Sequence, residues 1–170
     1  EDRLGGKDIY SASKASAEIA VKAYLESFDL LKKNNVRVGI ARAGNVIGGG
    51  DWAENRLIPD CIKSWSKLKK VSIRNPYSTR PWQHVLEAIR GYIVLAINLK
   101  RNKKLHGEAF NFGPNVKNGK NVISLVKEMR IYWKSVDWEI KKKKNFFESK
   151  LLKLNSSKSK KLLNWSCLLN

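Results

Sequence analysis

Hydrophobic and polar residues follow two different periods along the 170-residue chain. Stretches with apolar residues every three or four positions predict amphipathic helices, and short β-rich apolar runs predict buried strands. The predicted helices are residues 10–28, 55–68, 84–99, 122–133 and 156–165, and the predicted strands are residues 36–44, 71–75, 108–114 and 138–142. Because helices and strands alternate with short connections, the pattern predicts an α/β fold.

Particular residues support the predicted helix boundaries. Pro59 lies in the first turns of its helix, where proline is tolerated, and Ser156 is expected to cap the last helix. The segment 75–83 is expected to be a loop that separates a strand from a helix. No internal repeat or low-complexity linker divides the chain, so the sequence predicts one compact body.

Two helices have apolar positions that we expect to face the core. In the first helix these are Ile19, Ala23, Tyr24 and Phe28. In the helix at 84–99 they are positions 85, 86, 89, 93, 96 and 97.

The net charge of +19 makes nucleic-acid binding a candidate function. Its distribution argues against a specific nucleic-acid site. Residues 1–90 carry 16 basic and 10 acidic side chains, whereas residues 91–170 carry 18 and 5, many of the basic ones in lysine-rich runs. Such runs are typical of a solvated surface. Nonspecific binding to polyanions remains open.

Other features of the composition suggest a cytoplasmic protein. No apolar run is long enough to span a bilayer, and no charged-then-apolar leader precedes the first helix. Cys61 and Cys167 show no metal-ligand spacing, so we expect two free, buried thiols and no metal site. The chain begins with Glu1, and Met129 is its sole methionine, which leads us to expect a fragment of a longer protein.

A tyrosine and a lysine are four positions apart at the start of the first predicted helix. Tyr10 and Lys14 should share one helix face, one turn apart. An ammonium group near a phenol favours the phenolate, which would make the tyrosine a usable acid or base. The same spacing also occurs by chance in helices without catalytic function, so the pair alone leaves both interpretations open.

Several motifs in one order give the pair a context. "YSASK" matches the tyrosine–lysine signature of the short-chain dehydrogenase/reductase superfamily. Together with "ARAGNVIGGGDWAENRLIPD", "IRNP", "TRPWQHVLEAIRGY" and "FNFGP", it closely resembles the CDP-glucose 4,6-dehydratases, in the extended, sugar-nucleotide branch of that superfamily. The resemblance covers nearly the whole chain and implies a partial Rossmann-like fold with the substrate-binding C-terminal part.

The resemblance implies roles for two residues in catalysis and cofactor binding. Tyr10 would remove the proton of the sugar 4-hydroxyl while hydride passes from C4 to NAD. Lys14 would hold the nicotinamide ribose of NAD and favour the ionised tyrosine through its charge.

The resemblance also implies substrate-binding residues. Asn45 would contact the sugar diphosphate, the backbone amide of Leu57 would meet the diphosphate at a helix N-terminus, and Arg80 would clamp the nucleotide diphosphate. Arg74 falls where the family approaches the nucleotide base. Each position also has a structural interpretation: a turn residue for Asn45, core packing for Leu57, and surface positions for the arginines.

The resembled enzymes place further elements before the tyrosine–lysine helix. These are the glycine-rich dinucleotide loop, the first parallel strands and a Ser or Thr followed by an acidic pair, none of which this sequence contains. We therefore expect residues 1–50 to be the C-terminal portion of the NAD-binding domain and residues 51–170 to be mainly sugar-nucleotide-binding. Without those strands, the edge of the strand at 36–44 should lack a partner.

The resemblance implies that the parent protein is a lyase that converts CDP-glucose to CDP-4-keto-6-deoxyglucose and forms a homodimer. The isolated chain is expected neither to bind NAD usefully nor to dehydrate CDP-glucose. Two alternatives remain: a sugar-nucleotide 4-epimerase of the same superfamily, and a noncatalytic basic remnant that binds polyanions.

Overall fold

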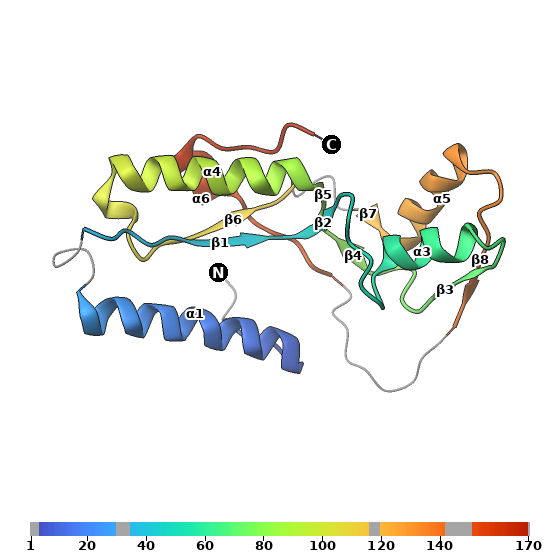
Figure 1. Ribbon diagram of the computed structural model, residues 1–170, viewed down its shortest axis with the longest axis horizontal. Coiled ribbons are helices and arrows are strands. Elements are labelled where there is room, and N and C mark those ends of the chain that lie inside the picture. The colour runs from blue at the N-terminus through green and yellow to red at the C-terminus, as the bar shows by residue number, and fades with distance from the viewer. Residues whose placement is uncertain (1–3, 30–34, 116–119, 142–150, 170) are drawn as a thin grey trace.

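The computed structural model describes residues 4–29, 35–115, 120–141 and 151–169 (Figure 1). Its α-helices are α1 (Ile9–Phe28), α3 (Leu57–Trp65), α4 (Val85–Arg101), α5 (Val122–Tyr132) and α6 (Ser157–Leu163), with a short 3₁₀ helix η1 at Lys103–Leu105. Its strands are β1 (Ile40–Ala43), β2 (Asn45–Ile47), β3 (Val71–Ile73), β4 (Thr79–Arg80), β5 (Trp82–His84), β6 (Ala109–Phe112), β7 (Lys120–Asn121) and β8 (Trp138–Ile140). The predicted α/β class is confirmed.

The strands form two-stranded sheets, three of which are parallel. β1 pairs with β6, β2 with β5 and β3 with β8 in parallel, whereas β4 and β7 are antiparallel. Parallel pairing needs crossover connections, and α4 supplies one between the β1–β2 region and β6. In Figure 1, α1 lies on one side of the β1–β6 pair and α4 and α6 on the other, which gives three layers.

The boundaries of α1 follow from its flanking residues. The Asp8 carboxylate accepts a hydrogen bond of 2.9 Å from the backbone N–H of Ser11, which caps the first turn. Asp29 ends the helix in the left-handed conformation, with φ of 44°. Between these caps, Ala15 and Leu25 are the buried residues, whereas Ile19, Tyr24 and Phe28 are exposed. The predicted core side of this helix is therefore wrong.

The predicted core side of α4 is also wrong, although its position in the chain is confirmed. The apolar positions Leu86, Ile89, Ile93 and Ile97 are exposed. The buried side instead carries Ala88, Gly91, Leu95 and Leu99, together with the carboxylate of Glu87. A Cβ at Gly91 would lie 2.5 Å from the Phe112 ring, so a small residue allows this side to approach β6 closely. Two apolar sides compete on this helix, and packing against β6 selects one.

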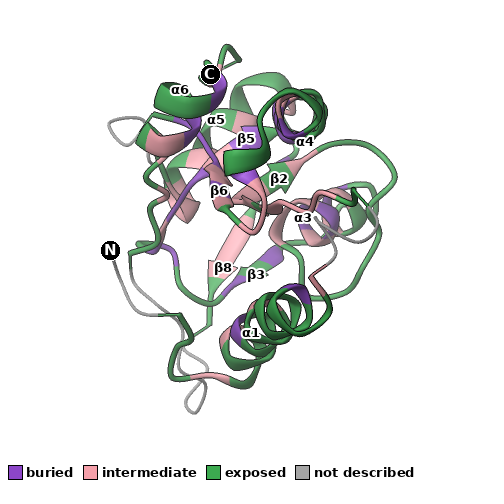
Figure 2. Ribbon diagram, turned by 90° about the vertical axis from the view of Figure 1, so that its left-hand side faces the viewer, coloured by how far each residue is buried: buried purple, intermediate pink, exposed green. Residues whose placement is uncertain are grey.

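Most of the buried apolar residues form two clusters, and Figure 2 shows buried segments on elements of both, such as α4 and β3. The first lobe, around β1, β6, α4 and α6, contains Leu95, Leu99, Leu105, Phe110, Phe112, Leu163 and Trp165. The second lobe, around α3, β3, α5 and β8, contains Cys61, Trp65, Val71, Ile73, Val126 and Val136. Both lobes take segments from several parts of the chain, so they are interleaved in sequence.

Three local predictions need correction. The predicted loop at 75–83 contains β4 and β5, because both short strands find partners in distant segments. Ser156 begins α6 without a side-chain cap, since its hydroxyl donates to the Gly113 carbonyl at 3.3 Å instead. Both cysteines are free, but only Cys61 is buried, whereas Cys167 is half-buried.

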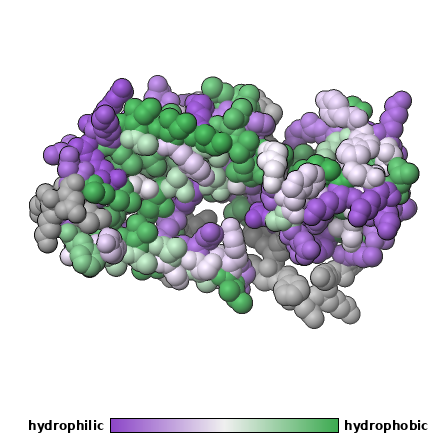
Figure 3. All heavy atoms as spheres, viewed as in Figure 1, coloured by the Kyte–Doolittle hydropathy of each residue, from purple (hydrophilic) through white to green (hydrophobic). Residues whose placement is uncertain are grey.

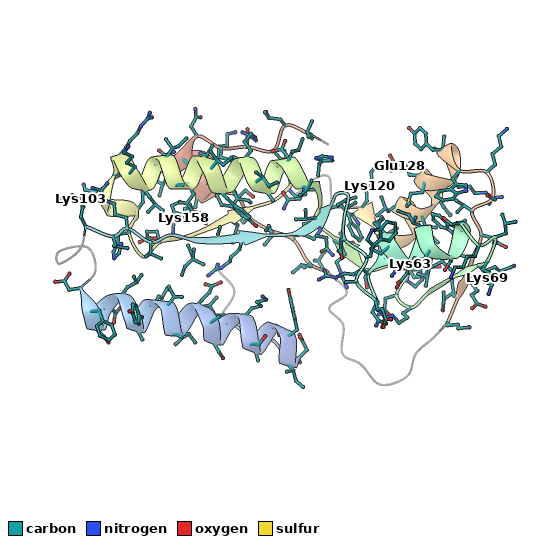
Figure 4. The ribbon with its side chains drawn as sticks, in the orientation of Figure 1. Lys63, Lys69, Lys103, Lys120, Glu128 and Lys158 are labelled. Atoms are coloured by element: carbon teal, nitrogen blue, oxygen red, sulfur yellow. The ribbon has the colours of Figure 1, made fainter. Side chains whose placement is uncertain are left out.

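The lysines that Figure 4 labels lie on several elements in both lobes. Two of them pair with acidic side chains: Lys120 with Glu128 at 2.5 Å and Lys158 with Glu108 at 2.5 Å. These pairs are largely exposed, as expected of a solvated charged surface. No helix in the described ranges combines the length and apolar character that crossing a membrane requires.

Candidate active site

Tyr10 and Lys14 lie in the first two turns of α1, as the sequence predicts. The ammonium nitrogen of Lys14 is 5.6 Å from the centroid of the Tyr10 ring. At this distance a cation interacts favourably with the electrons of the ring. The Tyr10 side chain is 71% exposed, so its hydroxyl is accessible to a ligand from solvent.

An ion pair that the sequence analysis missed connects α1 to the central strand. The guanidinium of Arg42 in β1 contacts both carboxylate oxygens of Glu18, at 2.7 and 2.5 Å. Glu18 follows Lys14 by four residues on the same side of the helix, so the pair directs this side toward β1. An arginine within an otherwise apolar strand is the sequence signal that could have revealed the contact.

We expect Glu18→Gln to loosen α1 from β1, because a neutral amide cannot replace a charged, bidentate contact. Tryptic cleavage after Lys14 and Lys22 should then become about threefold faster or more, since cleavage follows local opening. Limited proteolysis with mass spectrometry measures this. The matched control is Glu26→Gln, an exposed position on the same helix. Equal cleavage rates for the two variants would show that the ion pair does not hold α1.

The segments "RAGN" and "TRPW" come together beside the end of β1. Asn45 opens β2 and lies opposite Trp82 of β5 in the parallel register. Between β1 and β2, a Cβ at Gly44 would lie 2.6 Å from the Pro81 carbonyl oxygen, so glycine is required for this close approach. Arg80 is buried, with 8% of its surface exposed, and one guanidinium nitrogen donates to the Thr79 carbonyl at 3.0 Å.

A shallow depression adjoins these segments. Its volume is about 80 Å³, and it is lined by β2, the glycine loop and the first half of α3, through Val46, Ile47, Gly48, Gly49, Gly50, Asp51, Trp52, Ile58, Pro59 and Ile62. Leu57 begins α3 next to this lining, after Arg56, whose side chain does not cap the helix. The Arg56 side chain therefore makes no capping hydrogen bond to the first turn of α3, and helix N-termini of this kind can bind anions.

Arg74 lies farther along the second lobe, just after β3. Arg74 is exposed, and its charge is close enough to α3 to affect the pKa of Asp60. Partial burial raises the pKa of Asp60, whereas the charges of Lys63 and Arg74 act in the opposite direction.

His84 has a structural role, since its Nδ1 accepts from the Leu86 N–H at 3.2 Å and caps α4.

The elements that carry the predicted site residues follow one another from the first lobe to the second. Figure 1 shows the N-terminal end of α1, with Tyr10 and Lys14, at the same end of the first lobe as the carboxyl end of β1. Asn45 and the β4–β5 segment follow directly there, with α3 beyond them. Ligands of open α/β sheets bind at the carboxyl ends of the parallel strands. Arg74 follows β3 and lies near the first turn of α3, where its charge acts on Asp60.

Comparisons with known proteins agree with this geometry. Residues 2–113 match the model of the NAD dependent epimerase/dehydratase family. The CDP-glucose 4,6-dehydratase of Salmonella typhimurium is 43% identical over 166 residues, which cover 95% of this chain and 46% of that enzyme. The chain thus spans about half the length of the curated relative it matches.

Solved structures share the fold at low sequence identity. The dTDP-glucose 4,6-dehydratase of Bacillus anthracis, solved with NAD, has a TM-score of 0.76 and 23% identity, and the match covers 98% of this chain and 49% of that one. The UDP-glucuronic acid 4-epimerase of Bacillus cereus, solved with UDP-glucuronic acid and NAD, has a TM-score of 0.77 and 21% identity. This match covers 100% of this chain and 53% of the epimerase chain. The predicted Rossmann-like fold is confirmed, and the family match over most of the chain establishes that this protein belongs to the NAD dependent epimerase/dehydratase family.

Proposed function

We propose that this chain is part of an NAD-dependent lyase that dehydrates CDP-glucose to CDP-4-keto-6-deoxyglucose. The observation that carries the proposal is the 43% identity to a CDP-glucose 4,6-dehydratase over 95% of the chain. The juxtaposed Tyr10 and Lys14, at the same end of the first lobe as the carboxyl end of β1, support it. The proposal concerns the whole protein, of which this chain would supply one part of the active site.

Tyr10 and Lys14 would perform the proton chemistry. Tyr10 would act as the base that removes the proton of the sugar 4-hydroxyl, with the Lys14 ammonium 5.6 Å from the centroid of its ring. Lys14 would also donate a hydrogen bond to the nicotinamide ribose. NAD, when bound, would supply the acceptor for the C4 hydride and the donor of that hydride to C6. The 4-ketone acidifies the C5 proton, so water leaves across C5 and C6 with no net oxidation.

Other residues would bind the nucleotide diphosphate. Asn45 can donate its amide to a phosphate oxygen, and the first N–H groups of α3 at Leu57 can donate to another. The Arg80 guanidinium suits a diphosphate, and Arg74 would contact the nucleotide farther out. The chain would contribute residues 1–50 to NAD binding and residues 51–170 mainly to sugar-nucleotide binding.

The epimerase alternative is less well supported. Epimerases appear among the structural relatives, but at identities such as 21%, which supports a common fold and not a common substrate. We further propose that the complete enzyme is a cytoplasmic homodimer. The exposed Tyr24 and Phe28 rings, which contact each other on α1, support a dimer because contiguous exposed apolar surface is typical of interaction sites.

The experiment that tests the function uses a fusion enzyme. The N-terminal segment of the Salmonella typhimurium relative, which carries the elements expected before α1, is joined to residues 1–170. The fusion is incubated with NAD and CDP-glucose, and the nucleotide product is identified by mass spectrometry and NMR. Loss of one water with a ketone at C4 is the expected result. A product of unchanged mass with inverted C4 would indicate an epimerase and overturn the proposal.

A further inference from the structure

The Glu18–Arg42 ion pair joins two elements that both lead to the candidate active site. Glu18 lies in the middle of α1 and Arg42 in β1, and the guanidinium contacts both carboxylate oxygens, at 2.7 and 2.5 Å. The pair is partly buried, since the side chains of Arg42 and Glu18 are 34% and 15% exposed. A bidentate contact of this kind fixes the relative orientation of two groups, which a single exposed contact does not.

Strand β1 is apolar apart from Arg42. Its other residues are Ile40, Ala41 and Ala43. Figure 3 shows hydrophobic residues gathered over α4 and the strand below it, whereas the second lobe is more hydrophilic. A charged group in apolar surroundings is costly unless it is paired or reached by water. Loss of the Glu18 charge should therefore move α1 away from β1, so that water reaches Arg42.

Helix α1 connects Glu18 to the proton-transfer pair. Lys14 precedes Glu18 by about one turn and Tyr10 by about two, which places Tyr10 about 12 Å from Glu18 along the helix axis. The Asp8 carboxylate accepts from the Ser11 N–H at 2.9 Å, so the turn that carries Tyr10 is capped. The helix therefore transmits the position of Glu18 to Tyr10.

The strand connects Arg42 to Asn45, three residues later. Three residues of extended chain span about 10 Å. The path between them is constrained, because a Cβ at Gly44 would lie 2.6 Å from the Pro81 carbonyl oxygen and Asn45 is paired with Trp82. The position of Arg42 therefore determines that of Asn45.

The two elements run in opposite directions past the ion pair. In Figure 1 the N-terminal end of α1 and the carboxyl end of β1 lie at the same end of the first lobe. Spans of about 12 Å along the helix and about 10 Å along the strand thus bring Tyr10 and Asn45 to a similar level along β1. Both spans start from the same contact.

We propose that Glu18 and Arg42 are positioning residues that set the distance between the Tyr10 hydroxyl and the Asn45 amide. The inference rests on the proposed function for the roles of Tyr10 and Asn45. Glu18 and Arg42 act through the elements that they anchor, and not on the substrate itself. Their effect can be large, because a misplacement of about 1 Å in an active site can cost about 100-fold in rate.

A double-mutant cycle in the fusion enzyme tests the positioning role. Glu18→Gln should lower kcat for CDP-glucose about tenfold, with KM changed less than about twofold, because the base is displaced while the substrate-binding residues remain. In the Tyr10→Phe background the same change should lower the residual turnover less than about twofold, since the displaced hydroxyl is already absent. A role in stability alone would lower turnover by the same factor in both backgrounds.

Two further variants complete the kinetic test. Arg42→Gln should reproduce the loss in kcat, because removal of either partner breaks the ion pair. Glu26→Gln removes an exposed carboxylate from the same helix and should leave kcat unchanged. A kcat for Glu18→Gln or Arg42→Gln equal to that of Glu26→Gln would contradict the inference.

A second measurement needs neither substrate nor NAD. Spin labels are attached to the 170-residue chain through Ser16→Cys on α1 and Leu86→Cys at the start of α4, two exposed positions on opposite sides of the β1–β6 pair. Cys167→Ser removes the half-buried thiol. Cys61 stays unlabelled because it is buried, and burial raises its pKa to about 12.

Pulsed electron paramagnetic resonance of the labelled chain should give a distance distribution about twofold broader in Glu18→Gln than in Glu26→Gln, since α1 is released from β1. Identical distributions, or equal effects of Glu18→Gln on turnover with and without the Tyr10 hydroxyl, would overturn the inference. A fusion that does not dehydrate CDP-glucose would instead overturn the proposed function. The distance distributions would still decide whether the ion pair positions α1.

Discussion

Replacing Tyr10 with phenylalanine should lower the turnover of CDP-glucose by the fusion enzyme about 100-fold or more. The change removes only the hydroxyl that would accept the proton of the sugar 4-hydroxyl, and proton-transfer groups typically contribute on that scale. The 71% exposed ring makes no buried packing contact that the loss of one oxygen would disturb. The fall should therefore appear in kcat, with NAD and CDP-glucose binding largely retained.

The matched control for this prediction is Tyr24→Phe. Tyr24 lies on the same helix, is 55% exposed and packs against Phe28 with ring centroids 4.6 Å apart. Its turnover should equal that of the unmodified fusion. If Tyr10→Phe retained near-normal turnover, or changed KM alone, Tyr10 would have no role in proton transfer. Steady-state kinetics with both variants at one pH distinguishes these outcomes.

Phe112→Ala should lower the free energy of unfolding of the first lobe by about 3–5 kcal/mol, the range found for large-to-small substitutions in cores. The ring is fully buried and meets Tyr92 and Trp165 edge to face, with centroids 5.9 and 5.0 Å apart. It also fills the space that Gly91 leaves on α4. Because the whole cluster is small, one ring is a large part of it.

Urea unfolding of the 170-residue chain, followed by circular dichroism, measures this loss. The control is Tyr132→Ala, which removes an aromatic ring that is 86% exposed at the end of α5. Its effect should stay within about 0.5 kcal/mol, as for most surface substitutions. A loss below about 1 kcal/mol for Phe112→Ala would show that this ring does not anchor the first lobe.

The hydrophobic period determined where the helices and the strands β1, β3, β6 and β8 lie. The predicted helices at 10–28, 84–99 and 122–133 match α1, α4 and α5 closely, because each long apolar period is a local property. The pair Tyr10 and Lys14 could also be placed on one helix face from spacing alone. The ordered motifs around them indicated the family, and the comparisons confirmed it.

Short strands with distant partners could not be read from the sequence. β4 and β5 contain only two and three residues. They pair with β7 and β2, and the paired residues are up to 42 positions apart in the sequence. Such segments have little local preference, since their hydrogen bonds form only when the chain has folded. For this reason, the sequence predicted a loop at 75–83 and not these two strands.

The sequence by itself therefore determined the α/β class, the helix positions and the Tyr10–Lys14 pair, because these depend on residues a few positions apart. Tertiary structure alone decided which side of α4 is buried, since both sides are apolar and Phe112 accommodates only the one with Gly91. It also decided the Glu18–Arg42 contact and the approach of Gly44 to Pro81, which join residues 24 and 37 positions apart. Contacts across such separations depend on how layers pack, which no local pattern encodes.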